Sequence, residues 1–340
     1  MTNQKTFKFI CIGKRLLRIL LGLLCTIILL VAVLAGIQCI ATSCEKEQNP
    51  ALGEMVDVNG TKMHVYTEGQ GETTYVILSG GGIGAPVLEY KPLWTRFAEH
   101  GRIAVVEYMG YGWSEDTDAP RTSKNIVEEI RAALKGADIN PPYVLVAHSI
   151  GGIYAMAYAQ LHEDELDAII ALDTTLPRGI IKAQEDGQTA QDSLPQFGTI
   201  SLLRKAGILR AMLWLNPLMV SGAPQGVYNE EEVRKIAMVT GWDYPSHTLI
   251  NEMKTLERNM SDLTDFEFPK TLPVLMIQAS PPGEESETHE WFLSERKRLT
   301  ENLDHGKVVE LPAGHSSIYW CLSDDIVRET REFLKQAVIN

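Results

Sequence analysis

The chain has 340 residues, 45% of them hydrophobic, and a formal net charge of −13 at pH 7. Its length alone allows roughly two domains. The five cations before Glu45 are accompanied by no acid, so the remainder of the chain is more acidic than the whole. An acidic body of this kind argues against a nucleic-acid partner.

An uncharged, mostly apolar run of 19 residues, Ile19–Ile37, lies near the N-terminus. A helix of this length, rising about 1.5 Å per residue, spans most of the hydrocarbon core of a bilayer. All charges before the run are positive, and the positive-inside rule therefore predicts a cytoplasmic N-terminus and an extracytoplasmic body. A cleaved signal peptide is the alternative, although its apolar region is usually about 7–15 residues long. We expect a single-pass membrane protein with an uncleaved anchor.

The anchor divides the chain into four parts. We expect a basic cytoplasmic segment at 1–18, a transmembrane helix at 19–37, a tether at 38–53 and one large domain at 54–340. Of the five cysteines only Cys321 lies in that domain, so no disulfide framework is expected within it.

Strand and helix signals alternate along the large domain. Asn59-Gly60, between two runs of alternating polarity, predicts a β-hairpin. Apolar runs predict further strands at 74–79, 103–107, 143–147, 166–172, 272–279 and 308–311. Helices are expected at 88–100, 122–135, 153–161 and 324–338. This alternation predicts an α/β fold with a mostly parallel central sheet flanked by helices.

About a hundred residues between Asp173 and Leu272 carry no strand signal. Amphipathic stretches at 201–215, 230–239 and 248–260 indicate helices there. An insertion between the sixth and seventh strands is expected to form a helical lid, at about 177–270, that excludes water and shapes a pocket. An apolar set in the first stretch lines an acyl pocket or packs the lid on the body; its members are Leu202, Leu203, Ile208, Leu209, Met212, Leu213 and Trp214.

The stretch Val144–Gly152 reads Val-Leu-Val-Ala-His-Ser-Ile-Gly-Gly. A strand that ends in a sharp turn with one serine and continues as a helix has the geometry of a nucleophile elbow. The turn presents the Ser149 hydroxyl, and free N–H groups at the helix N-terminus face a developing oxyanion. Ala147 replaces the first glycine of the G-x-S-x-G pattern, whereas Gly151 keeps the second. The pattern predicts Ser149 as a nucleophile.

Gly80–Gly84 is a glycine-rich run directly after the strand at 74–79. It lacks the G-x-x-x-x-G-K-[ST] pattern of a phosphate-binding loop. Because Ser149 lies downstream, we expect its backbone N–H groups to approach a reacting oxyanion. A flexible turn is the alternative.

From about Met55 to the C-terminus, the chain resembles the α/β-hydrolase fold superfamily. Four ordered motifs carry the resemblance: Leu-Ser-Gly-Gly-Gly at 78–82, Glu-Tyr-Met-Gly-Tyr-Gly-Trp-Ser at 107–114, Ala-His-Ser-Ile-Gly-Gly at 147–152, and Gly-His at 314–315. The family usually has Asp where Glu107 stands. The chain order of nucleophile, acid and histidine is that of the family.

The resemblance implies a role for particular residues. Ser149 falls on the nucleophile and His315 on the general base. The backbone N–H of Ile150 falls on one oxyanion donor, and that of Gly81 on the second, with Gly82 as the next choice. The family chemistry implies no metal and no organic cofactor.

The acid departs from the common pattern of the family. The loop after the seventh strand, where an Asp is usual, reads Ala-Ser-Pro-Pro-Gly-Glu-Glu-Ser-Glu at 279–287. Some members use an acid at the end of the sixth strand, and Asp173 matches that position. We expect Asp173 to be the acid, with Glu284 or Glu285 as the alternative. Many relatives keep a non-catalytic Asp at the position of Asp173, so a purely structural role for Asp173 is the other interpretation.

These expectations combine into a membrane-anchored serine hydrolase of the carboxylesterase or lipase kind. It would cleave an ester or a small amide through an acyl-enzyme on Ser149. The expected substrate is a small-molecule ester or a lipid-like molecule, and the sequence leaves the oligomeric state open. The alternatives are a proline-iminopeptidase-like peptidase, a perhydrolase or lyase on the same residues, and a non-catalytic binding or sensing module at the cell surface. An acid within hydrogen-bond reach of His315 would count against the non-catalytic module.

Overall fold

The computed structural model of the chain describes residues 2–185, 187, 189, 192, 194–220, 222–224, 226–283 and 286–338, with side chains described from residue 13 to residue 337. An eight-stranded sheet forms the centre of this described part, in the order β1-β2-β4-β3-β5-β6-β7-β8. The strands are β1 Glu54–Val58, β2 Thr61–Glu68, β3 Thr74–Leu78, β4 Arg102–Val106, β5 Tyr143–His148, β6 Leu166–Leu172, β7 Val274–Ala279 and β8 Gly306–Leu311. β1 and β2 form an antiparallel edge, and the strands from β4 to β8 pair in parallel.

The antiparallel edge begins with the predicted hairpin. Asn59 and Gly60 connect β1 to β2 with φ angles of 56° and 84°. A two-residue turn with both φ angles positive matches the twist of the strands, and Asn-Gly adopts it readily. The hairpin prediction is confirmed.

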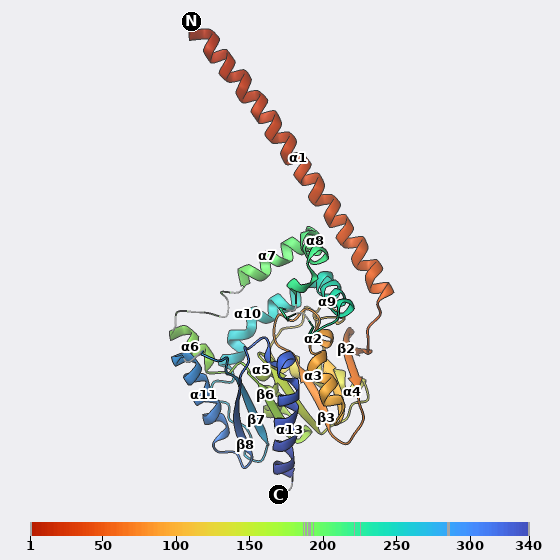
Figure 1. Ribbon diagram of the computed structural model, residues 1–340, viewed down its shortest axis with the longest axis vertical. Coiled ribbons are helices and arrows are strands. Elements are labelled where there is room, and N and C mark those ends of the chain that lie inside the picture. The colour runs from red at the N-terminus through yellow and green to blue at the C-terminus, as the bar shows by residue number, and fades with distance from the viewer. Residues whose placement is uncertain are drawn as a thin grey trace.

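Helices cover both faces of the sheet (Figure 1). Along β3, Val76 and Leu78 belong to the core on one face, whereas Tyr75 and Ile77 belong to the core on the other. A strand buried on both faces is apolar throughout, which explains why the central strands were visible as short apolar runs. The covering helices are α2 Pro86–Glu89, α3 Lys91–Ala98, α4 Ser123–Gly136, α5 Gly151–Leu161, η1 Glu163–Glu165, α11 Glu287–Thr300, α12 Ile318–Cys321 and α13 Ser323–Val338.

The helix expected at 88–100 is divided into α2 and α3 at Tyr90. Pro92 lies in the first turn of α3. A proline fits there because the first turn has no intrahelical partner for the missing N–H, whereas the interior of one longer helix would lose a hydrogen bond.

The segment between β6 and β7 is helical, as the sequence predicts. Its elements are α6 Gly179–Glu185, α7 Leu194–Lys205, α8 Ile208–Leu215, η3 Pro217–Met219, α9 Glu230–Asp243 and α10 His247–Ser261. They lie over one end of the sheet, and α7, α8 and α9 contact α1 (Figure 1). We call this segment the insertion; its action as a lid stays a prediction.

α1, Thr2–Gln48, is one long helix that leaves the body at the end formed by the insertion (Figure 1). Its part from Gly13 to Gln48 has the length and apolar composition of a membrane anchor or of a signal sequence. The expected tether, 38–53, is helical as far as Gln48, because its polar side chains find partners on the insertion. The C-terminal helix α13 lies toward the opposite end of the body.

Candidate active site

Ser149 follows β5 directly and has a φ of +54°, in the left-handed region that non-glycine residues rarely adopt. α5 begins two residues later, at Gly151. A Cβ atom at Gly151 would lie 2.6 Å from the carbonyl oxygen of Leu78 on β3, so glycine is needed for the helix and the sheet to pass this closely. The elbow geometry expected around Ser149 is therefore present.

His315 lies between Ser149 and Asp173. Its Nε2 is 3.1 Å from the Ser149 Oγ, and its Nδ1 is 2.6 Å from the Asp173 Oδ2. In this arrangement Nε2 is placed to accept the serine proton, while the carboxylate holds a proton on Nδ1. The side chain of His315 is 50% exposed, so part of the imidazole is open to solvent.

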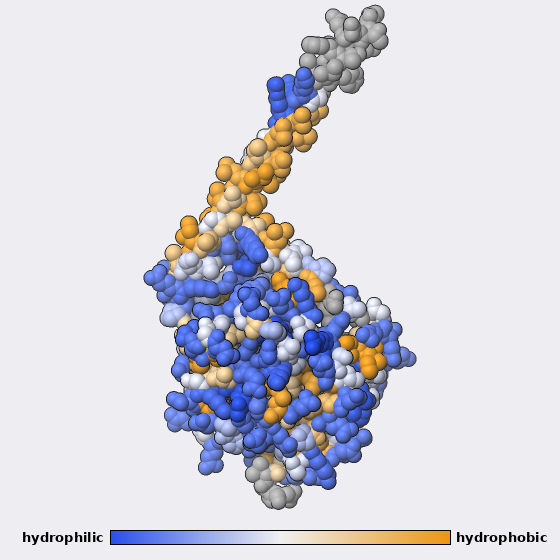
Figure 2. All heavy atoms as spheres, turned by 180° about the vertical axis from the view of Figure 1, so that it is seen from behind, coloured by the Kyte–Doolittle hydropathy of each residue, from blue (hydrophilic) through white to orange (hydrophobic). Residues whose placement is uncertain are grey.

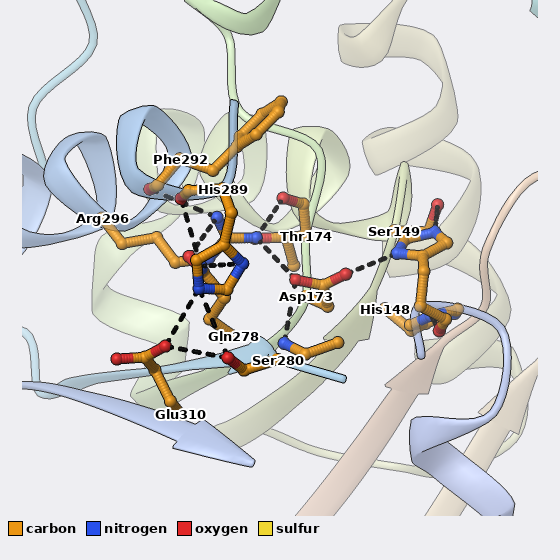
Figure 3. Close-up of polar contacts among 12 residues, drawn as sticks. His148, Ser149, Asp173, Thr174, Gln278, Ser280, His289, Phe292, Arg296 and Glu310 are labelled. Carbon is orange, nitrogen blue, oxygen red and sulfur yellow. Dashed lines mark hydrogen bonds and ion pairs between the residues drawn. The ribbon is translucent and has the colours of Figure 1, made fainter. Parts of the chain in front are cut away.

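Asp173 lies at the end of β6, and its second oxygen is also engaged. Oδ1 accepts hydrogen bonds from the Ala279 N–H, at 3.1 Å, and from the Arg296 guanidinium, at 2.9 Å. Figure 3 shows Asp173 between Ser149 on one side and Arg296 with Thr174 on the other. The alternative acids, Glu284 and Glu285, lie outside the described residues.

Arg296, on α11, is 2% exposed and places a positive charge beside the Asp173 carboxylate. Burial opposes ionisation of Asp173, but the His315 hydrogen bond and the Arg296 charge together hold the pKa of this carboxyl below its usual value. Asp173 is therefore ionised at neutral pH and able to stabilise a protonated imidazole.

His148, directly before the serine, joins two loops of the site. Its Nε2 lies 3.0 Å from the backbone carbonyl of His315, and its Nδ1 lies 2.6 Å from the Tyr90 hydroxyl. A carbonyl oxygen only accepts, so the proton is assigned to Nε2, and Tyr90 donates to Nδ1. The same hydroxyl accepts the Gly80 N–H at 2.9 Å. Burial, reinforced by the His315 ring, lowers the pKa of His148 to about 3, which keeps this ring neutral.

The two residues expected to donate to the oxyanion, Gly81 and Ile150, are neighbours in the structure. A Cβ atom at Gly81 would lie 2.7 Å from the Cδ1 of Ile150, so the glycine loop packs directly on the residue after the serine. Neither the Gly81 nor the Ile150 N–H has a backbone partner among the described residues. Two free N–H groups next to a serine are a suitable arrangement for binding an oxyanion.

Glu107 stands where the family usually has Asp, and it is fully buried. Its carboxylate accepts hydrogen bonds from the N–H groups of Val87, at 3.1 Å, and Trp113, at 2.8 Å. His64 Nε2 accepts from the Gly53 N–H at 2.9 Å, so its Nδ1 carries the proton and donates to Glu107 at 2.9 Å. Glu107 therefore fixes the turn after β4 against the first turn of α2.

A cleft of about 380 Å³ opens beside Asp173 and His315. Leu176, Met260 and Phe292 give it an apolar wall, while Gln278 and His289 give it a polar one. His289 Nε2 lies 3.0 Å from Glu310 Oε2, which lies 3.0 Å from the Ser280 hydroxyl (Figure 3). No group of three or more His, Cys, Asp or Glu side chains suited to a metal ion occurs in the described part of the chain.

The sequence motifs did not mark Arg296 or Tyr90 as residues of the site. Arg296 reaches Asp173 across 123 positions of sequence, and Tyr90 reaches His148 across 58. Neither residue stands in a motif, so no local signal marked it. The serine and the histidine were visible because each stands in a short motif that the turn geometry requires.

A sequence profile described as the alpha/beta hydrolase family matches residues 75–328. The chain is a member of this family. It is 33% identical over 298 residues to the uncharacterized protein YbdG of Bacillus subtilis (strain 168), covering 84% of this chain and 86% of that protein. It is also 31% identical over 161 residues to a pimeloyl-[acyl-carrier protein] methyl ester esterase of Xanthomonas oryzae pv. oryzae, covering 46% of this chain and 57% of the esterase.

Solved structures of other proteins share the fold of this alpha/beta hydrolase. The epoxide hydrolase VrEH1 of Vigna radiata has a TM-score of 0.65 and 19% identity, covering 83% of this chain and 97% of the other. The enol-lactonase of Burkholderia xenovorans LB400 has a TM-score of 0.54 and 18% identity, covering 83% of this chain and 100% of the enol-lactonase. At these identities the likeness concerns the fold alone.

Proposed function

We propose that this alpha/beta hydrolase is a serine esterase that forms an acyl-enzyme on Ser149. The observation that carries the proposal is the pair of contacts made by His315, at 3.1 Å to the Ser149 Oγ and 2.6 Å to the Asp173 Oδ2. A serine hydroxyl is a weak nucleophile unless a base takes its proton as it attacks, and the base must be held in one orientation.

The reaction follows from this geometry. Ser149 Oγ attacks the carbonyl carbon of the ester while its proton passes to His315 Nε2, and Asp173 stabilises the imidazolium. The N–H groups of Gly81 and Ile150 receive the oxyanion. His315 then gives the proton to the leaving alcohol, which departs as the acyl-enzyme forms. Water, deprotonated by His315, attacks the acyl carbon, and release of the acid returns the proton to Ser149.

An ester is favoured as the substrate by two observations. The cleft on the Asp173 side of His315, which Ser149 does not line, has an apolar wall made by Leu176, Met260 and Phe292, and this wall suits a hydrocarbon group. One of the similar proteins is named as a methyl ester esterase. A non-catalytic module is disfavoured, because Asp173 lies within hydrogen-bond distance of His315.

The apolar N-terminal helix supports a further part of the proposal. Gly13–Gln48 is long and apolar enough to span a bilayer, and the charges before it are all basic. We therefore propose a single-pass anchor with a cytoplasmic N-terminus and an extracytoplasmic hydrolase domain. Accessibility of Cys321 to a membrane-impermeant maleimide in intact cells tests this orientation, with labelling only after lysis as the contradicting result.

A fluorophosphonate probe tests the chemistry in the full-length chain. Activated serines react with this probe, so we expect labelling of the wild type and none of Ser149→Ala. Asp173→Asn is expected to slow labelling by about 10³–10⁴-fold, because the imidazole loses its orienting carboxylate.

Glu285→Gln is the matched control, since Glu285 is the alternative acid named from the sequence. We expect this variant to react at the wild-type rate. Slow labelling of Glu285→Gln together with normal labelling of Asp173→Asn would reassign the acid. Absence of labelling in a folded wild type would overturn the proposed esterase.

A further inference from the structure

The insertion presents an unusual number of apolar side chains to solvent. Trp214 is 82% exposed, Leu215 is 75% exposed and Leu202 is 68% exposed, although apolar side chains of this size are normally covered. They belong to α7 and α8 and continue into η3. We call this set the exposed apolar surface; its members are Leu202, Met212, Trp214, Leu215, Leu218 and Met219. The sequence set that was expected to line a pocket or pack on the body therefore points partly outward.

The charge of the same segment differs from that of the rest of the body. Residues 194–229 contain no Asp or Glu and three cations, Arg204, Lys205 and Arg210, in a chain whose net charge is −13. Arg204 and Arg210 pair with Asp243 and Glu45, whereas Lys205 is exposed. An apolar surface with an exposed cation beside it is compatible with the headgroup and acyl boundary of a bilayer with anionic lipids.

The position of α1 brings this surface to the level of the membrane. A Cβ atom at Gly207, the residue before α8, would lie 2.2 Å from the backbone oxygen of Leu34. Leu34 is within the apolar run that ends at Ile37, about 4.5 Å from its end along the helix. α8 therefore starts beside the last turn of the predicted span. Figure 2 shows apolar colour on α1 down to its junction with the body.

Polar contacts just beyond the span hold α1 and the insertion in one arrangement. The Arg210 side chain donates to Gln38 at 2.7 Å, to Thr42 at 2.9 Å and to Glu45 at 2.6 Å. Lys46 pairs with Asp243 at 2.6 Å. These contacts join the helix that enters the membrane to α8 and α9, and they set the height of the exposed apolar surface relative to the span.

We propose that the exposed apolar surface is inserted in the bilayer that α1 spans, and that the substrate is an acyl ester held in that bilayer. The second part rests on the proposed esterase function. α7 connects the two places, because Phe197 in its first turn lies 3.7 Å from a Cβ atom built on Gly82, next to the oxyanion loop, while Leu202 belongs to the exposed apolar surface. An ester drawn from the membrane along α7 arrives beside Ser149.

Depth-dependent fluorescence quenching tests the insertion. The full-length chain is reconstituted in vesicles of phosphatidylcholine and phosphatidylglycerol whose acyl chains carry bromine at carbons near the headgroup. Trp214 is one of six tryptophans, and we expect Trp214→Phe to lose most of the bromine-dependent quenching. Trp291→Phe, on α11, is the matched control and is expected to keep it. Equal quenching in Trp214→Phe and the wild type would overturn the proposal.

A second copy of the chain is the competing occupant of the surface. If dimers cross-link through Cys placed at Leu215, and bromolipids do not quench Trp214, the surface is a protein interface and the proposal fails. The full-length chain with Leu215→Cys, in vesicles at several lipid-to-protein ratios, separates the two results.

Activity measurements separate the inference from the function on which it rests. For Trp214→Ser combined with Leu215→Ser, we expect hydrolysis of a long-chain ester embedded in vesicles to fall about tenfold, and that of a water-soluble acetate ester to change less than about twofold. Leu161→Ser, at an exposed position on α5, is the control. If the double variant loses both activities, or loses neither, the membrane-held substrate is contradicted. If the wild type is inactive on both esters, the proposed esterase function is contradicted.

Discussion

At the level of single side chains, Arg296 supports the ionisation of Asp173 together with the His315 hydrogen bond. We expect Arg296→Met to raise the pKa of Asp173, because burial, which opposes the charge, stays while an opposing cation is lost. Since Asp173 must be ionised to stabilise the imidazolium, the acid limb of kcat/KM should move to higher pH. The profile is measured between pH 4 and 9 with a soluble ester.

Arg298→Met provides the control for this variant. Arg298 lies on the same helix and pairs with Glu295 rather than with Asp173. Its removal should leave the acid limb in place. An unchanged profile in Arg296→Met as well would mean that the Arg296 charge does not influence the reaction.

The residues that the sequence could predict are those with a local signature. Ser149 and His315 stand in short motifs, and Asp173 follows an apolar run that reads as a strand end. The sequence could not choose between Asp173 and Glu285, because that choice depends on which loop faces the imidazole. The distance of 2.6 Å between His315 Nδ1 and Asp173 Oδ2 favours Asp173, and it arises from the order of strands in the sheet.

At the level of elements, the contact between α5 and β3 depends on Gly151. We expect Gly151→Ala to destabilise the protein by about 1–3 kcal/mol, because the new Cβ would lie 2.6 Å from a backbone oxygen that cannot rotate away. The shift of α5 should also misplace Ser149 and slow probe labelling. Chemical denaturation of the full-length chain in micelles measures the first effect.

Gly198→Ala on α7 serves as the comparison. Gly198 is helical and nothing lies within 4 Å of an added Cβ. The substitution should stabilise α7 by about 0.5–1 kcal/mol, because alanine has the higher helix propensity. A greater loss of stability at Gly198 than at Gly151 would contradict this account of the elbow.

Elements were predictable where the burial pattern is simple. β6 begins and ends at the expected residues, and the hairpin turn lies at Asn59-Gly60. The expected tether was harder to interpret, because its helix depends on Gln38 and Glu45 meeting Arg210 far along the chain. These contacts form only when the domain is folded, so the hydrophobic periodicity of residues 38–48 does not predict them.

For the molecule as a whole, Glu89 gives stability a dependence on pH. Burial raises the pKa of Glu89 to about 8, from an ordinary value of 4.5, even though the Ala85 N–H donates to the carboxyl. A carboxyl with a raised folded-state pKa contributes stability that is complete below pH 4.5 and is lost as pH rises through 8. The free energy of unfolding should fall by up to about 1.4 kcal/mol per pH unit within that window.

Glu89→Gln removes this titration and should flatten the dependence between pH 5 and 8. Glu99→Gln, at an exposed surface position, should keep it. Denaturation followed by tryptophan fluorescence over pH 5–9 measures both variants. A slope that persists unchanged in Glu89→Gln would mean that another group causes it.

The union of α1 with the insertion has a kinetic consequence. A flexible tether would let the hydrolase domain move through a large volume above the membrane. In this chain α1 is helical to Gln48 and is bonded to α8 and α9, so the connection between the domain and the membrane is rigid. On our proposal, such an enzyme meets its membrane-held ester by lateral diffusion in its own bilayer. Its rate then follows the mole fraction of ester in that membrane, and dilution of the vesicles at constant composition leaves the rate per enzyme unchanged.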